Sequence, residues 1–326
     1  MNKKAIILFS VLSAVVLIAT QFMVKPVAAQ TYQQITGKLG GADYLIRIPD
    51  NWDGDLVVMC RGYTPTPVGI PMLEFYASMF GFITANGFAL AMSSYGEAGF
   101  CVQKGMIRTH QLTEYVIDNY DVTGKVYLFG VSMGGGIALL LGAKYPHLYD
   151  GVFEMAGVKD VAAQYTLKMY LASLTDNDDL AAAMLANGGQ VPPCPMMFGT
   201  DIPAALAGYR AYSLTSATDI ALELGGTPEK KPKAYERVSP IFNALDIAVP
   251  TISVHGGADS IVPYAQSLAY LEAVTQAGYS DLYRLYGVPG ADHVDTLPAM
   301  GTQIYLGFTW LVNWVETGTP APPSSP

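Results

Sequence analysis

The stretch GVSMG at residues 130–134 decides the fold, because it places the pattern Gly-x-Ser-x-Gly between two different structural elements. Residues 125–129 (KVYLF) predict a short buried strand, and residues 134–145 (GGGIALLLGAKY) predict a helix that ends before Pro146. A serine at such a sharp strand-to-helix turn presents its hydroxyl at the end of the sheet. The glycines permit a strained backbone there, and the helix N-terminus favours developing negative charge. Ser132 is therefore our candidate nucleophile.

The composition limits the classes of protein to which the chain can belong. With 326 residues, 51% of them hydrophobic, it can form one large domain or two smaller ones with a substantial core. The net charge of −9 argues against a nucleic acid partner, because phosphate binding needs a basic surface. Cys60, Cys101 and Cys194 lack the spacing of a zinc site. We expect these three cysteines to be small buried residues of the core. We predict neither a metal nor a cofactor.

Residues 1–29 have the features of a signal peptide. Two lysines near the start precede the apolar residues 5–19, and small residues at 27–29 mark an expected cleavage site. The alternative is an uncleaved anchor, because residues 5–24 approach membrane-spanning length. The short apolar stretch favours cleavage, so we expect a secreted or periplasmic protein that touches a membrane only if this leader is retained. Export would also permit one disulfide among the three cysteines.

After the leader, short apolar strands alternate with helical stretches. The predicted strands are residues 42–48, 55–60, 88–93, 125–129, 151–155, 251–254 and 281–286. The predicted helices between and after them are residues 72–86, 104–119, 134–145, 264–277 and 302–315. Continuous apolar strands in this alternation predict an α/β fold, with a mostly parallel sheet and helices on both faces.

Residues 157–243 interrupt this alternation with helical pieces separated by glycine, proline and polar residues. We expect a helical cap over the carboxyl edge of the sheet, because a loop leaving that edge emerges beside Ser132. The alternative is a small independent domain elsewhere on the surface. The predicted core is then residues 30–156 and 244–316, and the Pro/Ser-rich tail 317–326 is expected to be disordered.

A serine hydroxyl needs a base within hydrogen-bond reach, and the base needs an orienting acid. In sheets of this class the chain order is serine, acid, histidine. His293 follows the last predicted strand, and Asp259 lies in a glycine-rich turn after the strand 251–254, so these two fit the order. The alternative role for Asp259 is a helix cap or turn residue. Glu154, near the end of another strand, is the second candidate acid.

The remaining histidines and acids fit this chemistry less well. His110 lies on a predicted helix, and His147 lies about 20 Å from the serine at the far end of its helix. His255 ends a strand but precedes the best acid. Asp292 and Asp295 are too close in sequence to the candidate base to orient it easily.

An oxyanion hole needs two backbone donors aimed at the developing negative oxygen. Met133, directly after the nucleophile, is expected to supply one donor, and the loop after strand 55–60 the other. In that loop the N–H of Tyr63 is our first choice and that of Gly62 the second, because glycine permits close backbone approach. Arg61 is expected to contact an anion or to form a surface salt bridge.

Three motifs, GVSMGG from residue 130, HGGADSIVP from residue 255 and ADH from residue 291, resemble the α/β-hydrolase superfamily and occur in its order. The resemblance covers nearly all of residues 40–316, and residues 94–105 also resemble secreted esterase and prolyl-oligopeptidase-like branches. It implies that Ser132 is the nucleophile, Asp259 the acid and His293 the base. Many relatives have His-Gly where this chain has Arg-Gly in the oxyanion loop, which affects the geometry of the donors.

These observations leave three functions open. The first, which we favour, is a secreted serine hydrolase that cleaves small carboxylic esters through an acyl-enzyme. The second is a serine peptidase acting on short peptides, and the third is a non-enzymatic binding protein on a hydrolase scaffold. The intact set of serine, acid and histidine argues against the third. Dehalogenases and epoxide hydrolases are disfavoured because they have a carboxylate at the nucleophile position.

Overall fold

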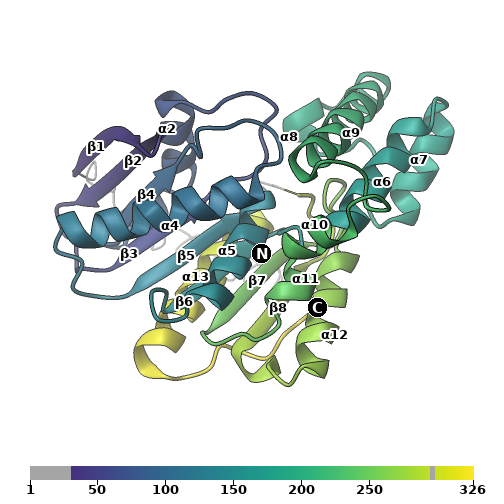
Figure 1. Ribbon diagram of the computed structural model, residues 1–326. Coiled ribbons are helices and arrows are strands. Elements are labelled where there is room, and N and C mark those ends of the chain that lie inside the picture. The colour runs from purple at the N-terminus through teal and green to yellow at the C-terminus, as the bar shows by residue number, and fades with distance from the viewer. Residues whose placement is uncertain (1–30, 294–297) are drawn as a thin grey trace, which may run out of the picture.

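The computed structural model describes residues 31–293 and 298–326, and an eight-stranded sheet forms its centre (Figure 1). The strands are β1 (Tyr32–Leu39), β2 (Ala42–Pro49), β3 (Leu56–Cys60), β4 (Ala89–Ser93), β5 (Val126–Val131), β6 (Gly151–Met155), β7 (Thr251–Gly256) and β8 (Tyr283–Val288). Their order is β1-β2-β4-β3-β5-β6-β7-β8. β2 runs antiparallel to both of its neighbours, and the other pairs are parallel. The predicted mostly parallel sheet is confirmed.

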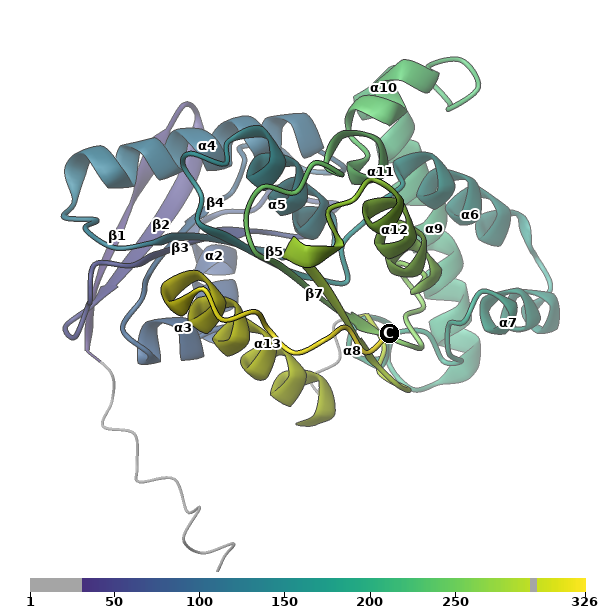
Figure 2. The same cartoon turned by 90° about the horizontal axis from the view of Figure 1, so that it is seen from below.

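Helices cover both faces of this sheet (Figure 2). One face carries α4 (Val102–Asn119), α5 (Met133–Lys144) and α12 (Ala265–Gln276), and the other carries α2 (Ile70–Met79), α3 (Phe82–Ala85) and α13 (Pro298–Thr317). Strand side chains alternate between the two faces. Thus Val58 and Leu128 pack under α5, whereas Phe129 and Phe153 pack against Phe308 of α13. The sheet is therefore buried on both sides, as its apolar strands predict.

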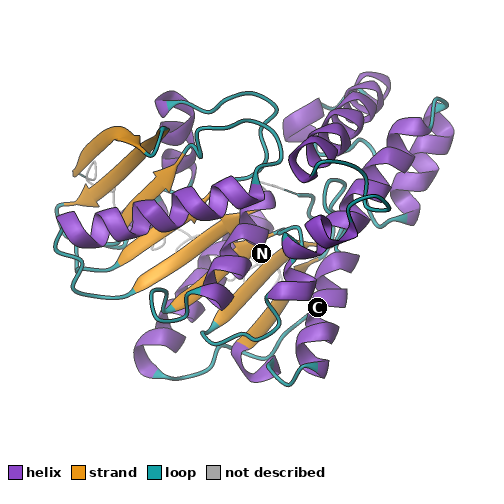
Figure 3. Ribbon diagram, viewed as in Figure 1, coloured by secondary structure: helices purple, strands orange, loops and turns teal. Residues whose placement is uncertain are grey.

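The segment between β6 and β7 consists of helices joined by loops (Figure 3). It comprises α6 (Val161–Ser173), α7 (Asn177–Ala186), α8 (Pro195–Phe198), α9 (Ile202–Leu224), α10 (Pro232–Arg237) and α11 (Pro240–Asn243). Asp219 of α9 accepts a hydrogen bond of 2.7 Å from the hydroxyl of Tyr63, in the loop after β3. Tyr209 of α9 donates to the carbonyl of Ser260, in the loop after β7. This helical segment therefore packs on loops at the carboxyl ends of the strands.

Three local elements differ from the sequence-based expectation. β1 was not predicted, because its sequence YQQITGKL is polar. Its residues are largely exposed, and this is possible because β1 is an edge strand that pairs only with β2. The expected helix over residues 72–86 is divided into α2 and α3, with a turn at Phe80 and Gly81 between them. The last strand, β8, begins after a short 3₁₀ turn at Ser280–Leu282.

The tail at residues 317–326 was expected to be disordered, and this was wrong. The backbone N–H of Ser325 donates to the carbonyl of Leu285 at 3.0 Å, and the N–H of Gly287 donates to the carbonyl of Ser325 at 2.9 Å. Ala321 is buried against the helix-α13 side of the sheet. Composition alone could not reveal this order, because the tail is held by the unpaired backbone groups of an edge strand.

The predicted leader, residues 1–29, lies outside the described residues. Within residues 31–293 and 298–326, no helix combines the length and the hydropathy needed to cross a bilayer. Cys60, Cys101 and Cys194 are all described, and they are buried thiols, as expected for small core residues.

We expect Ser325→Pro to lower the free energy of unfolding by about 1 kcal/mol, because proline removes the N–H that bonds to β8. Deleting residues 319–326 should lower it further, since Ala321 and both backbone bonds are lost. Urea unfolding at pH 7 measures the effect. Ser325→Ala is the matched control, because it keeps the backbone bonds. Equal urea midpoints for Ser325→Pro and Ser325→Ala would show that the tail does not stabilise the fold.

Candidate active site

Ser132 occupies the sharp turn between β5 and α5, as the motif predicts. Its backbone has φ 58° and ψ −125°, which is a strained conformation for a residue with a side chain. The N–H of Ser132 donates to the carbonyl of Met155 on β6 at 2.9 Å, and its carbonyl accepts from Gly135 at 2.8 Å. These bonds to a neighbouring strand and to the helix hold the turn, so the hydroxyl stands at the carboxyl end of the sheet.

The glycines of the motif are required by space. A Cβ on Gly130 would lie 2.4 Å from the carbonyl oxygen of Gly134. A Cβ on Gly134 would lie 2.0 Å from the carbonyl oxygen of Cys60 on β3. Both distances are far shorter than any atomic contact allows, so the backbone can turn here only because these side chains are missing.

The structure brings the three predicted residues together from three separate loops. The Oγ of Ser132 lies 2.8 Å from Nε2 of His293, and Nδ1 of His293 lies 2.7 Å from Oδ2 of Asp259. His293 and Asp259 are buried. Because a carboxylate only accepts, Nδ1 of His293 carries the proton, and Nε2 is free to accept one from the serine hydroxyl.

Asp259 is held as an ionised acceptor. Its Oδ1 accepts from the backbone N–H groups of Ile261 and Val262, both at 2.8 Å. Its Oδ2 faces His293 and also Nε2 of His255 at 3.0 Å. Burial raises the pKa of Asp259, but the two imidazoles outweigh this and hold its pKa below the ordinary value. The carboxylate therefore remains negative beside His293.

His255 is the residue near this centre that sequence reasoning missed. It was considered only as a base and set aside because it precedes Asp259 in the chain. In the structure it is the penultimate residue of β7, is completely buried, and contacts the same carboxylate oxygen of Asp259 as His293 does. The sequence HGGAD indicates this contact. Asp259 follows His255 by four residues, and the glycine-rich turn between them returns the chain to the end of the same strand.

Glu154, the second candidate acid, has a different position. It forms a fully buried ion pair with Lys159, with Nζ 2.7 Å from Oε1. Its other oxygen accepts from the N–H of Gly157 at 2.8 Å, and Ser253 also bonds to the carboxylate. Glu154 therefore supports the loop after β6 and does not contact His293.

Asp292 and His110, which were also considered from sequence, have structural partners. Asp292 accepts from the N–H of Ser260 at 2.7 Å and from the side chain of Gln190 at 2.8 Å. His110 stacks on the ring of Tyr145 with centroids 4.0 Å apart. Asp295 lies outside the described residues.

The predicted oxyanion donors border the serine. Met133 is the first residue of α5, so its N–H has no acceptor within the helix. A Cβ on Gly62 would lie 3.2 Å from Cβ of Ser132, which places the backbone of this loop against the hydroxyl. Tyr63 follows, and its side chain is tied to Asp219.

Arg61 is neither on the surface nor free to bind an anion, so the sequence-based expectation for it was wrong. Its guanidinium is completely buried and lies 4.3 Å above the ring of Tyr95. It donates to the carbonyls of Ser94 and Glu97 at 2.8 Å and to that of Gly62 at 2.9 Å. Arg61 thus joins the loop after β3 to the loop after β4, and it fixes the backbone beside the serine.

A cavity of about 200 Å³ opens at Ser132 and His293. The other lining residues are Gly62, Tyr63, Phe75, Tyr76, Met79, Phe80, Val131, Met196, Met197 and Tyr212. None of these described lining residues is an acid or a permanent cation. Phe75 is 56% exposed and Met196 is 53% exposed, so the cavity has an apolar rim open to solvent.

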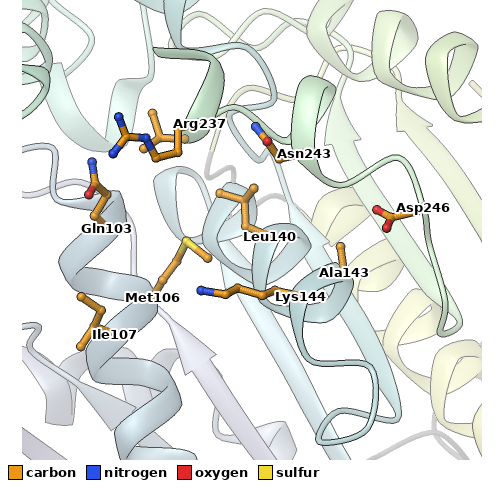
Figure 4. A pocket seen from close by; sticks show the side chains of 10 residues that line it. Gln103, Met106, Ile107, Leu140, Ala143, Lys144, Arg237, Asn243 and Asp246 are labelled. Atoms are coloured by element: carbon orange, nitrogen blue, oxygen red, sulfur yellow. The ribbon is translucent and has the colours of Figure 1, made fainter. Parts of the chain in front are cut away.

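A larger cavity of about 410 Å³ lies elsewhere, between α4, α5 and the α10–α11 region (Figure 4). Met106 of α4, Leu140 and Lys144 of α5, and Arg237 of α10 line it. Neither Ser132 nor His293 lines this cavity. The larger volume of this cavity is therefore no reason to choose it, whereas the hydrogen-bonded chain of Ser132, His293 and Asp259 makes the smaller cavity the candidate active site.

Lys168 of α6 is a buried amine behind the smaller cavity. Its Nζ lies 3.1 Å from the hydroxyl of Tyr209 and 5.4 Å from the ring centre of Tyr212, which lines that cavity. Burial lowers the pKa of Lys168 to about 7, although the charges of Asp259 and Asp292 act in the opposite direction.

We expect Lys168→Met to be more stable than the wild type at pH 7, with an advantage that shrinks by on the order of 2 kcal/mol by pH 9. The amine of Lys168 has a pKa of about 7 when folded and about 10.4 when unfolded, so between these values the unfolded chain binds more protons. Wild-type stability therefore rises with pH relative to the variant. Urea unfolding across this range measures the difference. Lys233→Met, at an exposed lysine, is the control, and a pH-independent difference for Lys168→Met would contradict the assignment.

Comparison with known protein families gives one match to the sequence. A family model described as serine aminopeptidase, S33, matches residues 108–293. Among curated proteins, none matches this sequence significantly.

Comparison with solved structures gives many similar folds. Puromycin hydrolase is 17% identical with a TM-score of 0.61, over 92% of this chain and 41% of its own. Carboxyl esterase 2 from Tuber melanosporum is 12% identical with a TM-score of 0.58, over 88% and 87%. Acylaminoacyl peptidase from Pyrococcus horikoshii is 11% identical with a TM-score of 0.56, over 88% and 42%. At these identities the likeness shows a shared fold. The chain spans about two fifths of puromycin hydrolase and of the peptidase.

Proposed function

The chain belongs to the serine aminopeptidase S33 family of α/β-hydrolases, and we propose that it cleaves carboxylic esters with Ser132, His293 and Asp259 as nucleophile, base and acid. The observation that carries this proposal is the continuous hydrogen-bond chain from the serine hydroxyl to the buried carboxylate, with links of 2.8 and 2.7 Å. A hydroxyl with an acceptor nitrogen at this distance, itself oriented by a carboxylate, is the arrangement that nucleophilic acyl transfer needs.

In this mechanism, Nε2 of His293 takes the hydroxyl proton while Oγ of Ser132 bonds to the ester carbonyl carbon. Asp259 stabilises the imidazolium that forms. The N–H groups of Met133 and Tyr63, with Gly62 as the second choice in the loop, bind the tetrahedral oxyanion. The imidazolium returns its proton to the leaving alcohol. Water, deprotonated by His293, then attacks the acyl-enzyme, and the imidazolium returns this proton to Oγ of Ser132 as the bond to the serine breaks and the carboxylic acid is released.

The cavity favours an ester with a short, uncharged acyl group. Aromatic and methionine side chains, including Phe75, Met196 and Tyr212, supply its walls, and its volume of about 200 Å³ is below that of sites for drug-sized ligands. An aminopeptidase needs a negative group for the free amine of its substrate, because a buried ammonium must be paired. The described lining residues contain no such group.

The second candidate is a peptidase acting on short peptides. The description of the matching family and the acylaminoacyl peptidase fold neighbour favour it. The same serine, histidine and aspartate serve both reactions, so substrate binding separates them. We also propose export to the cell exterior or periplasm, on the basis of the leader motif at residues 1–29.

We expect Ser132→Ala to lower kcat/KM for p-nitrophenyl butyrate by at least about 10³-fold, because the nucleophile is lost. Wild type should also be labelled by a fluorophosphonate probe, and Ser132→Ala should not. Ser173→Ala, at an exposed serine, is the control and should behave as wild type. A folded wild type that neither hydrolyses short esters nor reacts with the probe would refute the proposed function.

Matched substrates distinguish an esterase from a peptidase. We expect the butyryl ester to be cleaved far faster than the butyryl anilide, and free-amine aminoacyl anilides to have no advantage over their acetylated forms. The expectation for the free-amine substrates follows from the absence of a carboxylate among the described lining residues. Values of kcat/KM for the four substrates test this. Preferential cleavage of the free-amine anilide would assign the chain to the peptidases.

A further inference from the structure

Two imidazoles converge on one oxygen of Asp259. Nδ1 of His293 lies 2.7 Å from Oδ2, and Nε2 of His255 lies 3.0 Å from the same atom. His255 is completely buried, and Asp259 nearly so. The mechanism above uses His293 alone, so the second imidazole needs an explanation.

The partners of His255 fix the position of its proton. Nε2 faces two acceptors, Oδ2 of Asp259 and the carbonyl of Val262 at 2.9 Å, so this nitrogen carries the hydrogen. Nδ1 lies 2.7 Å from the hydroxyl of Ser267 on α12, which is buried and can donate to it. A neutral His255 therefore satisfies all its partners and acts on the carboxylate as an N–H donor.

We propose that His255 is a positioning residue for the reaction, which holds the Asp259 carboxylate toward His293 and limits the negative charge that its Oδ2 presents there. This inference rests on the proposed function. The positive end of the His255 N–H dipole points at Oδ2 and draws on the same lone-pair charge as the His293 N–H. The carboxylate of Asp259 is thereby fixed in orientation, and the proton affinity of His293 is limited.

Other ionisable groups surround this pair, and they come from several elements. They are Lys159 after β6, Lys168 on α6, Tyr209 and Tyr212 on α9, Tyr264 beside the His255 ring, and Asp292 next to His293. Lys159 is paired with Glu154, and Lys168 is bonded to Tyr209. Among the described residues, the side-chain donors that reach Asp259 directly are His255 and His293.

Removing the His255 donor has two consequences. The carboxylate loses one of the groups that fix its rotation, so His293 is less well oriented and kcat/KM falls. His293 also faces a more negative oxygen, so it holds its proton more tightly, and the acidic limb of the pH profile moves to higher pH. A residue that only fills space would not move this limb.

The test compares two substitutions of similar size. In His255→Gln the side-chain amide nitrogen takes the place of Nε2 and keeps a donor to Asp259, whereas in His255→Asn it takes the place of Nδ1. We expect His255→Asn to lower kcat/KM for p-nitrophenyl butyrate roughly tenfold or more, with the acidic limb shifted upward. His255→Gln should restore most of the activity and the wild-type limb. Profiles from pH 5 to 9, with thermal melts of each variant, provide the measurement.

The wild-type chain offers a readout that does not depend on a variant's folding. With ¹⁵N-labelled histidine, NMR should reveal one ring protonated at Nε2 and one at Nδ1, both with downfield-shifted hydrogens bonded to Asp259. Only one such hydrogen in the folded protein would overturn the inference. So would an active His255→Asn variant with an unshifted limb. Failure of the wild type to cleave esters or to label with fluorophosphonate would instead overturn the proposed function.

Discussion

The close approach of three backbone segments beneath Ser132 is the constraint on which the rest of this centre depends. The start of α5 passes so near the end of β3 that a single methyl group on Gly134 would penetrate the carbonyl of Cys60. The chain therefore has to turn through a strained conformation at Ser132, and bonds to β6 and α5 hold it there. This strained turn directs the hydroxyl of Ser132 out of a sheet that is otherwise buried on both faces.

Parallel strands then bring the partners to the same place. β5, β7 and β8 all end at one edge of the sheet, so loops far apart in sequence supply the serine, the acid and the histidine side by side. Buried charged groups hold the loops after the two strands that flank β5. Arg61 braces the loop after β3, and the pair of Glu154 and Lys159 braces the loop after β6. These buried charges thus fix the backbone on both sides of Ser132.

The sequence predicts the sheet, its helices and the meeting of Ser132, Asp259 and His293, because these depend on local pattern and on chain order. It does not predict β1, whose polar residues follow from its place at an edge. The expectation for Arg61 was wrong because two of its acceptors are carbonyls more than thirty residues away, which no spacing rule reveals. The chain-order rule that selects His293 as the candidate base excludes His255 from that role, because the rule concerns the base alone and says nothing about a second donor to Asp259.

The tail that follows α13 has a consequence for how copies of this molecule meet. Because Ser325 pairs with β8, the last strand in the order is not available for strand addition by a second chain. At the opposite end of the sheet, β1 is polar and exposed and carries Lys38, a kind of side chain that discourages such stacking. Both margins of the sheet are thus protected against edge-to-edge aggregation, one by the chain itself and the other by hydration and charge.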